Sequence, residues 1–157
     1  MATTCIFKKI VDIVIKDKDE NYLLIKYQNT AEDVWDIPSK EIITTETKAE
    51  IQHLLSDNFG TNAFLVQDKS PIILREEVLE SLTTLDCTEV DIEKHIYLVE
   101  FVGQNKNIKI QNTSIENVKW VKYCDLEHNL ASKMQWNYIQ ASMIFFIERG
   151  YIDIDKI

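Results

Sequence analysis

The sequence is short of residues that interrupt secondary structure, with only 3 glycines and 2 prolines among 157 residues. It contains no internal repeat, low-complexity tract or linker, so we expect a single domain spanning residues 1–157. Cysteine is also scarce. Cys5, Cys87 and Cys124 are odd in number, far apart and without a CxxC pair. That argues against a disulfide framework or a zinc site and favours reduced thiols.

Basic residues are outnumbered, because 17 Lys and Arg stand against 26 Asp and Glu and the formal net charge is −9. This balance opposes bulk binding of nucleic acid, since affinity for phosphate backbones comes mainly from Lys and Arg. It does not exclude a small nucleotide held with a divalent cation, which offsets charge locally. Long hydrophobic runs are absent too: residues 143–147 are too short to span a bilayer, and residues 1–9 have no signal-like organisation. We expect a cytoplasmic protein without a membrane anchor.

Hydrophobic residues, 45% of the chain, are enough for one core and fall into strand-like segments. A β-branched run at residues 10–15, a polar stretch at 16–21 and an apolar run at 22–27 (YLLIKY) predict a β-hairpin. Further strands are predicted at residues 34–37, 62–66, 72–75, 94–102, 108–111 and 118–121.

Two segments have helical patterns. Residues 47–50 (TKAE) fit a capping box with Thr47 as N-cap, and Ile51, Leu55 and Phe59 then recur every four residues as a buried stripe that Gly60 ends. A second helix is predicted over residues 131–149, with one face formed by Met134, Tyr138, Ala141 and Phe145 and a stop at Gly150. Strands before and between two helices predict a mixed sheet with helices on its faces.

The order strand, turn, strand, Trp-x-x-Pro, acidic loop, helix, Gly resembles the Nudix hydrolases. In that family a W-x-x-P-G-G turn precedes the signature G-x5-E-x7-R-E-U-x-E-E-x-G-U, where U is apolar. The matching residues here are Trp35, Pro38, Glu46 and Gly60, and residues 95–102 and 116–121 are similar to the second half of the family. The resemblance implies an α+β fold: a Nudix-like α/β/α sandwich whose mixed, curved sheet lies between the two helices.

The sequence departs from the signature at the glycines of the turn and at the glutamates of the helix, which are the residues that give the signature its chemistry. Ser39 and Lys40 replace the paired glycines of the turn. Anchoring the helix on Gly60 places R-E-U-x-E-E on residues 53–58 (HLLSDN), so that Leu54 and Asn58 stand at glutamate positions. Anchoring on Glu46 instead puts residues 55, 58 and 59 there, which retains no carboxylate. Because Mg²⁺ requires oxygen ligands, we expect a severely reduced metal affinity and rate.

The remaining carboxylates are the candidate metal ligands. Glu46, Glu50 and Asp57 are the predicted ligands of Mg²⁺ or Mn²⁺ if the protein is active, and Glu46 and Asp57 are the predicted catalytic residues. Each has a simpler interpretation: Glu50 as a residue that compensates the helix dipole, and Asp57 as part of a solvated helix face. His53, at the arginine position of the signature, is interpreted as a surface residue.

The candidate substrate-binding residues follow the second strand. Trp35 can stack on a base, and Ser39 and Lys40 can meet a phosphate, although core packing of Trp35 and a solvated Lys40 are the simpler interpretations. The resemblance also places a late acidic base in a loop, for which the acidic stretch at residues 76–93 is the candidate; a solvated loop is the alternative.

Two functional hypotheses follow. The first is a weakly active or non-hydrolysing Nudix-like module that needs no cofactor and binds a nucleoside diphosphate or a protein partner. The second is a divergent pyrophosphohydrolase, dependent on Mg²⁺ or Mn²⁺, acting on a nucleoside diphosphate linked to another moiety. The missing helix carboxylates favour the first hypothesis, and the retained Glu46, Glu50 and Asp57 motivate the second.

Overall fold

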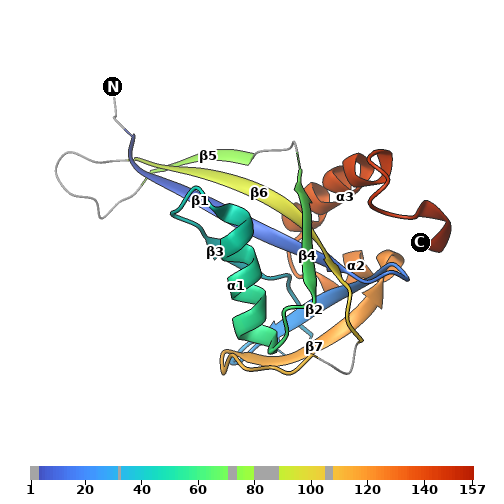
Figure 1. Ribbon diagram of the computed structural model, residues 1–157. Coiled ribbons are helices and arrows are strands. Elements are labelled where there is room, and N and C mark those ends of the chain that lie inside the picture. The colour runs from blue at the N-terminus through green and yellow to red at the C-terminus, as the bar shows by residue number, and fades with distance from the viewer. Residues whose placement is uncertain (1–3, 32, 71–73, 80–88, 105–107) are drawn as a thin grey trace.

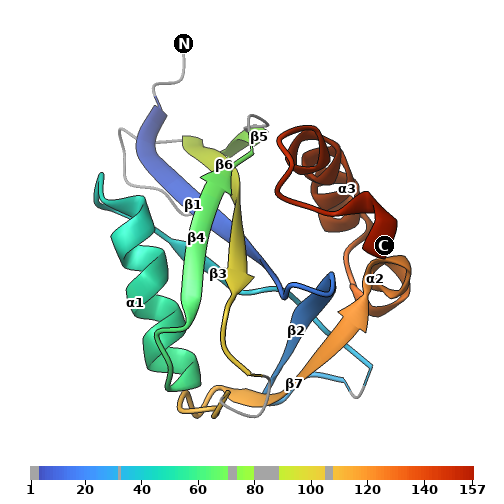
Figure 2. The same cartoon turned by 45° about the vertical axis from the view of Figure 1, so that its right-hand side comes forward.

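A computed structural model describes residues 4–31, 33–70, 74–79, 89–104 and 108–157 (Figure 1). The elements in chain order are β1 (Thr4–Lys16), β2 (Asn21–Tyr27), β3 (Ser39–Glu41), α1 (Thr47–Phe59), β4 (Phe64–Lys69), β5 (Leu74–Leu79), β6 (Glu89–Phe101), β7 (Ile115–Lys122), α2 (Tyr123–Asn129), α3 (Lys133–Glu148) and the short 3₁₀ helix η2 (Ile154–Lys156). Figure 2 shows α1 on one side of the sheet and α3 on the other, as the predicted sandwich requires.

The sheet is organised around the two longest strands, β1 and β6, which pair in parallel from Thr4 opposite Glu89 to Lys16 opposite Glu100, with one register shift between Thr4 and Ile6. The strand order is β4-β6-β1-β2-β7, with β3 paired to β1 and β5 paired to β6. All these other pairings are antiparallel, so the sheet is mixed, and it is curved. The predicted fold class is confirmed.

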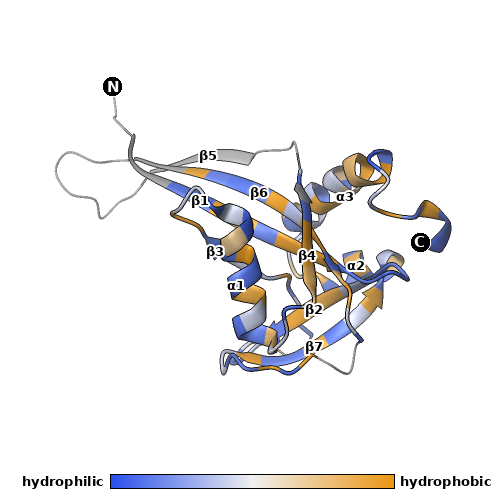
Figure 3. Ribbon diagram, in the orientation of Figure 1, coloured by the Kyte–Doolittle hydropathy of each residue, from blue (hydrophilic) through white to orange (hydrophobic). Residues whose placement is uncertain are grey.

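The two faces of the sheet carry separate hydrophobic cores, because side chains alternate along each strand. Figure 3 shows hydrophobic and hydrophilic residues interspersed along the strands. On β1, Val11, Ile13 and Ile15 face α1, whereas Val14 faces α3. The buried members of the α1-side core are Val11, Ile13, Ile15, Leu23, Ile25, Ile42, Ile51, Leu55, Phe59, Phe64, Tyr97, Val99, Phe101 and Ile115. The near-continuous hydrophobic run of β1 therefore reflects burial on both faces.

Helix α1 has the predicted bounds but not the predicted cap. Ile51, Leu55 and Phe59 are fully buried, and Gly60 ends the helix in the left-handed region at φ +66°, as expected. The N-cap, however, is Glu46, and no side chain caps the helix. The predicted capping box is wrong because Thr47 is itself the first helical residue, and the Glu50 N–H donates to the Glu46 carbonyl at 3.1 Å. The Thr47 hydroxyl instead accepts a hydrogen bond from Lys9 Nζ at 2.6 Å.

Helix α3 is slightly shorter than predicted and presents another face to the sheet. Its N-cap Ser132 accepts a hydrogen bond from the Gln135 N–H at 3.1 Å, and Gly150 follows at φ +77°. The residues buried along it are Trp136, Ile139, Ser142, Met143 and Phe146. Met134 and Ala141, which the sequence pattern placed on the packed face, are exposed, since the apolar stripe lies about one position further along the chain.

The hairpin and most other strands are confirmed, with shifted ends. Residues 34–37 are not a strand: Trp35 and Asp36 form only isolated bridges, to Leu130 and Ile25. Residues 108–111 form no strand, α2 was not predicted, and residues 72–73 of a predicted strand lie outside the described residues. Among the described helices, none is long and apolar enough to cross a membrane.

Candidate functional site

The predicted residues Glu46, Glu50 and Lys40 meet near the first turn of α1. Glu46 is exposed, and its backbone carbonyl accepts the Glu50 N–H at 3.1 Å. The Glu50 carboxylate pairs with Lys40 Nζ at 3.5 Å, with side-chain exposures of 35% and 43%. The structure thus brings together one predicted metal ligand and one predicted phosphate contact, in a pair that solvent screens strongly.

Two of the three signature glutamate positions further along α1, Leu54 and Asn58, lie against the protein interior. Leu54 packs against the α1-side core. Asn58 is buried; its side-chain oxygen accepts a hydrogen bond from the Asn112 amide at 3.0 Å, and its backbone carbonyl accepts the Gln111 N–H at 2.8 Å. Asp57 is exposed on the helix.

These residues do not fit a divalent cation of the kind the Nudix signature holds. Leu54 has no ligand atom, and the neutral oxygen of Asn58 already accepts a hydrogen bond. Glu50 and Asp57 are seven residues apart, about 10 Å along the helix axis. Within the described residues no group of three or more His, Cys, Asp and Glu side chains could hold a metal ion. The predicted ligands Glu46, Glu50 and Asp57 therefore form no such group.

The predicted substrate-binding residues are divided between the two faces of the sheet. Lys40 is opposite Val11 in the β1–β3 register and so faces α1, whereas Ser39 is opposite Asp12 and faces α3. Trp35 packs against the hydrophobic core on the α3 side of the sheet, whose buried members include Val14, Trp136 and Met143, and Lys119 Nζ lies 4.2 Å from its ring centroid. Strand β3 pairs with β1 and lies at an edge of the sheet. A single ligand that contacts both Ser39 and Lys40 would therefore have to pass around that edge.

Sequence reasoning missed a buried charge on the α3 side. Asp12 is only 1% exposed, and Lys94 Nζ lies 2.9 Å from its Oδ2. The contact is an ion pair without hydrogen-bond geometry, so neither carboxylate oxygen of Asp12 has a hydrogen-bond partner among the described residues. Lys94 also lines a hollow of about 190 Å³ between the sheet and the start of α3, with Ile10, Ile92, Ser132, Met134, Gln135 and Tyr138. The sequence signal that could have revealed this buried charge is Asp12 itself, a charged residue inside the β-branched run at residues 10–15.

A second missed feature lies on the α1 side. The buried ring of His95 contacts Glu93 through Nε2, 2.5 Å from the Glu93 Oε1. Its Nδ1 has no hydrogen-bond partner in the described part of the chain. The sequence offered only a polar pair two residues apart on a strand, a spacing that places both side chains on one face.

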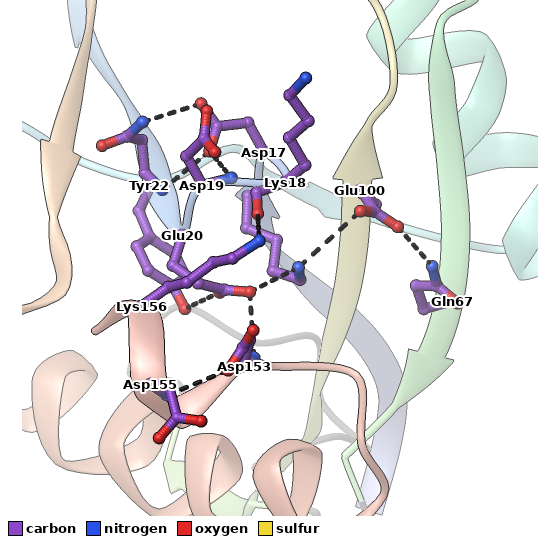
Figure 4. A network of polar contacts seen from close by, with 12 residues as sticks. Asp17, Lys18, Asp19, Glu20, Tyr22, Gln67, Glu100, Asp153, Asp155 and Lys156 are labelled. Atoms are coloured by element: carbon purple, nitrogen blue, oxygen red, sulfur yellow. Dashed lines mark hydrogen bonds and ion pairs between the residues drawn. The ribbon is translucent and has the colours of Figure 1, made fainter.

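A polar network at the β1–β2 turn, drawn in Figure 4, holds the turn to the C-terminal segment. The buried Glu20 carboxylate accepts hydrogen bonds from Lys16 Nζ at 2.9 Å, the Tyr22 hydroxyl at 3.0 Å and the Asp153 N–H at 3.1 Å. Burial first, and then the Glu20 carboxylate, raise the pKa of Tyr22 well above its ordinary range. Glu20 has φ +57°, a strained value for a residue with a side chain, and its three bonds hold it there.

The hollow beside this network, about 730 Å³, is larger than the one on the α3 side but contains none of the predicted site residues. The Asp17 carboxylate in its lining stabilises the β1–β2 turn, because it accepts hydrogen bonds from the backbone N–H groups of Asp19 and Asn21, each at 2.9 Å. We assign this region a structural role.

Comparison with known proteins places the chain by its fold. No family model matches the sequence, and no curated protein gives a match. Among solved structures, the chain is similar to the E. coli dihydroneopterin triphosphate pyrophosphohydrolase, with a TM-score of 0.61, 15% identity, and 92% of this chain and 99% of that chain covered. It is also similar to a C. elegans Ap4A hydrolase, with a TM-score of 0.58, 11% identity and coverages of 88% and 98%. A NUDIX hydrolase from Nitrosomonas europaea gives a TM-score of 0.56, 14% identity and coverages of 85% and 86%.

The chain therefore has the Nudix hydrolase fold. At these identities the likeness establishes the architecture and leaves the chemistry to be argued from the residues of this chain.

Proposed function

We propose that the protein is a Nudix-fold binding module for a nucleoside diphosphate or a related phosphoanhydride, with little or no metal-dependent hydrolysis. One observation carries this proposal: Leu54 and Asn58, at signature glutamate positions, are used for core packing and for a buried hydrogen bond to Asn112. Without those carboxylates the helix lacks the charge that fixes a divalent cation and orients water.

The ligand class is supported by the α3 side of the sheet and by the fold neighbours. The hollow lined by Lys94, about 190 Å³, offers a cation next to apolar side chains. It is smaller than the roughly 300–1,000 Å³ of whole small-molecule sites, so it would receive one phosphate group or one end of the ligand, with the rest lying outside it. The buried Asp12 carboxylate, 2.9 Å from Lys94 Nζ, favours the charged form of that lysine beside the hollow. Two of the similar structures are named for action on a triphosphate and on Ap4A, both of which contain phosphoanhydrides.

The test combines binding with turnover on a panel of nucleoside diphosphate-linked compounds, with Mg²⁺ and then Mn²⁺. A ligand at a hundred times its Kd stabilises the folded state by about 2.7 kcal/mol. For a domain of this size that raises Tm by roughly 5–10 °C. We expect stabilisation by at least one compound without phosphate release. Lys94→Gln should reduce the ligand-induced rise relative to its own unliganded Tm, whereas Lys122→Gln, at an exposed position outside the hollow, should not.

The alternative is a divergent metal-dependent pyrophosphohydrolase, and the closeness of Glu46, Glu50 and Lys40 at the start of α1 favours it. Metal-dependent turnover that Glu46→Gln or Asp57→Asn abolishes would establish this alternative and overturn the binding-module proposal. Turnover that survives both substitutions would overturn the assignment of these two carboxylates as catalytic. If no compound on the panel stabilises the protein, the protein-interaction form of the module becomes the hypothesis to pursue.

A further inference from the structure

Helix α3 covers the face of the sheet opposite α1 (Figure 2), and the side of the helix turned away from the sheet is exposed. The exposed residues along α3 are Lys133, Met134, Asn137, Gln140, Ala141, Ile144 and Glu148, which we call the outward face. At 3.6 residues per turn, these seven positions fall within about a third of the helix circumference. Met134 is 57% exposed and Ile144 is 60% exposed, so two large hydrophobic side chains lie on the outward face.

The apolar stripe that the sequence pattern predicted for α3 lies on or beside this outward face. Its members are Met134, Tyr138, Ala141 and Phe145, of which Tyr138 and Phe145 are partly buried at the margin. A second stripe, formed by Trp136, Ile139, Met143 and Phe146, packs on the sheet. Helix α3 therefore has apolar residues on two sides, whereas a surface helix ordinarily has charged and polar residues opposite its packed side.

The outward face also lacks charge along most of its length. Residues 134–147 contain no Asp, Glu, Lys or Arg, although charged residues make up 27% of the chain. Helix α1, which is described throughout, exposes Lys48, His53 and Asp57 and no large hydrophobic side chain. Depletion of charge together with exposed Met and aromatic residues is the composition of the centre of a protein–protein interface.

The two charges of the outward face lie at its opposite ends. Lys133 begins the helix and Glu148 ends it, about 24 Å apart along the axis. The next residue, Arg149, is directed to the side, with its guanidinium carbon 4.5 Å from the ring centroid of Phe145. The outward face is therefore positive at one end, uncharged in the middle and negative at the other end.

This arrangement is complementary to a second copy of itself. Two outward faces packed antiparallel place Lys133 of each copy next to the partner's Glu148, at both ends of the contact. Parallel packing would place like charges together. The antiparallel arrangement also brings the positive end of each helix dipole towards the negative end of the other.

The middle of the outward face allows two helices to approach closely. The midpoint between Lys133 and Glu148 falls between Gln140 and Ala141, so a two-fold axis would pass there. Ala141 is small, and the separation of packed helices, about 8–10 Å, depends on the side chains at the contact. The Gln140 amide can both donate to and accept from the amide of its own copy.

We propose that the outward face of α3 is the interface of a homodimer, in which two copies of α3 pack antiparallel across a two-fold axis near Ala141. A strip roughly 24 Å long and 10 Å wide is smaller than the roughly 800 Å² per partner of a standard interface. We therefore expect a weak, reversible dimer. The proposal goes beyond ligand binding and does not depend on it.

The test is sedimentation equilibrium of the full chain over a wide concentration range at physiological ionic strength. We expect the wild type to change reversibly from monomer to dimer as its concentration rises. Ile144→Glu should weaken dimerisation by about tenfold or more, because it places two carboxylates in an uncharged contact. Val102→Glu is the matched control, since Val102 is 63% exposed but lies outside α3, and this variant should dimerise as the wild type does.

Charge reversal tests the antiparallel arrangement. A two-fold interface contains every contact twice, so Lys133→Glu makes both ends repulsive, and so does Glu148→Lys. An exposed ion pair contributes up to about fivefold in affinity, so each variant should dimerise roughly 5–25-fold more weakly. In an equimolar mixture of the two variants, opposite charges meet at both ends. The mixture should therefore form dimers at concentrations at which each variant alone is monomeric. Lys48→Glu, the same change of charge on α1, should have no effect.

Three outcomes would overturn the proposal. A chain that stays monomeric at every concentration would leave the outward face to a different partner. A dimer that Ile144→Glu weakens no more than Val102→Glu does would have its interface elsewhere. A mixture of the two charge-reversal variants that dimerises no better than either alone would exclude antiparallel packing. Circular dichroism of the monomers checks folding, and if Ile144→Glu lowers the Tm, the charge-reversal variants decide.

Discussion

Neutralising Glu20 is the most informative test of what holds the fold together. The Lys16–Glu20 pair spans 2.9 Å with side-chain exposures of 5% and 1%, so both charges are out of solvent. Glu20→Gln leaves Lys16 buried with Glu100 as its remaining carboxylate, 3.9 Å away. Breaking one side of a buried pair costs about 3–5 kcal/mol. Total stabilities are only about 5–15 kcal/mol, so the loss is large.

The assay is urea unfolding followed by circular dichroism, with a matched ion pair as control. Lys26 and Glu116 are 2.7 Å apart, but the Glu116 side chain is 47% exposed. Glu116→Gln should therefore cost no more than about 1 kcal/mol, although its pair is the shorter one. The double variant Lys16→Met/Glu20→Gln removes both charges but keeps a side-chain oxygen at position 20 to accept from Tyr22 and the Asp153 N–H, so it should regain most of the stability lost in Glu20→Gln alone. If Glu20→Gln is no more destabilising than Glu116→Gln, the argument that burial makes this pair critical is refuted.

Three further outcomes are expected. Burial raises the pKa of Tyr22, so above the unfolded pKa of about 10 the unfolded chain loses this proton while the folded chain keeps it. The unfolding free energy that the buried hydroxyl contributes is therefore complete below a pH of about 10 and is lost as the pH rises above it. Tyr22→Phe should flatten the alkaline fall of the unfolding free energy by up to about 1.4 kcal/mol per pH unit; an unchanged slope in urea titrations between pH 9 and 11 would contradict this. Gly60→Ala should destabilise by more than Gly150→Ala: both have positive φ, costing about 1–2 kcal/mol, but only at Gly60 would the new Cβ meet another side chain, 2.8 Å from Gln111 Nε2. Equal losses in thermal unfolding would show that the flexible Gln111 moves away freely. Ser132→Ala removes the cap of α3 and should cost about 1 kcal/mol; an unaltered Tm would mean that the cap does not contribute.

The architecture was predictable where one physical rule dominated. Ile51, Leu55 and Phe59 indicate the buried stripe of α1 by spacing alone, and Gly60 ends the helix because it accepts a left-handed conformation. The cap of the same helix was not predictable. Thr47 has the right identity, but its hydroxyl bonds to Lys9, thirty-eight residues earlier, and no local pattern contains that contact.

The candidate sites were less predictable for the same reason. Ser39 and Lys40 are neighbours in sequence, yet strand alternation directs them to opposite faces once β3 pairs with β1. Lys9 and Lys69 line one hollow beside the start of α1 although sixty residues separate them in the sequence, and only the folded sheet brings β1 and β4 to the same place. Asp12 and His95 become noticeable through their burial, which cannot be read from the residues beside them.

The parallel pairing of β1 with β6 has a consequence for biosynthesis. Thr4 and Glu89 are partners, so one edge of the central strand has no partner until some eighty-five further residues have been made. At about 5–20 residues per second, that interval is roughly 4–17 s. Throughout it, a hydrophobic strand that is buried on both faces in the native state is exposed to other nascent chains. We therefore expect the yield of native protein to depend on chaperones that shield β1 during translation, and on expression temperature, more than the native stability alone would indicate.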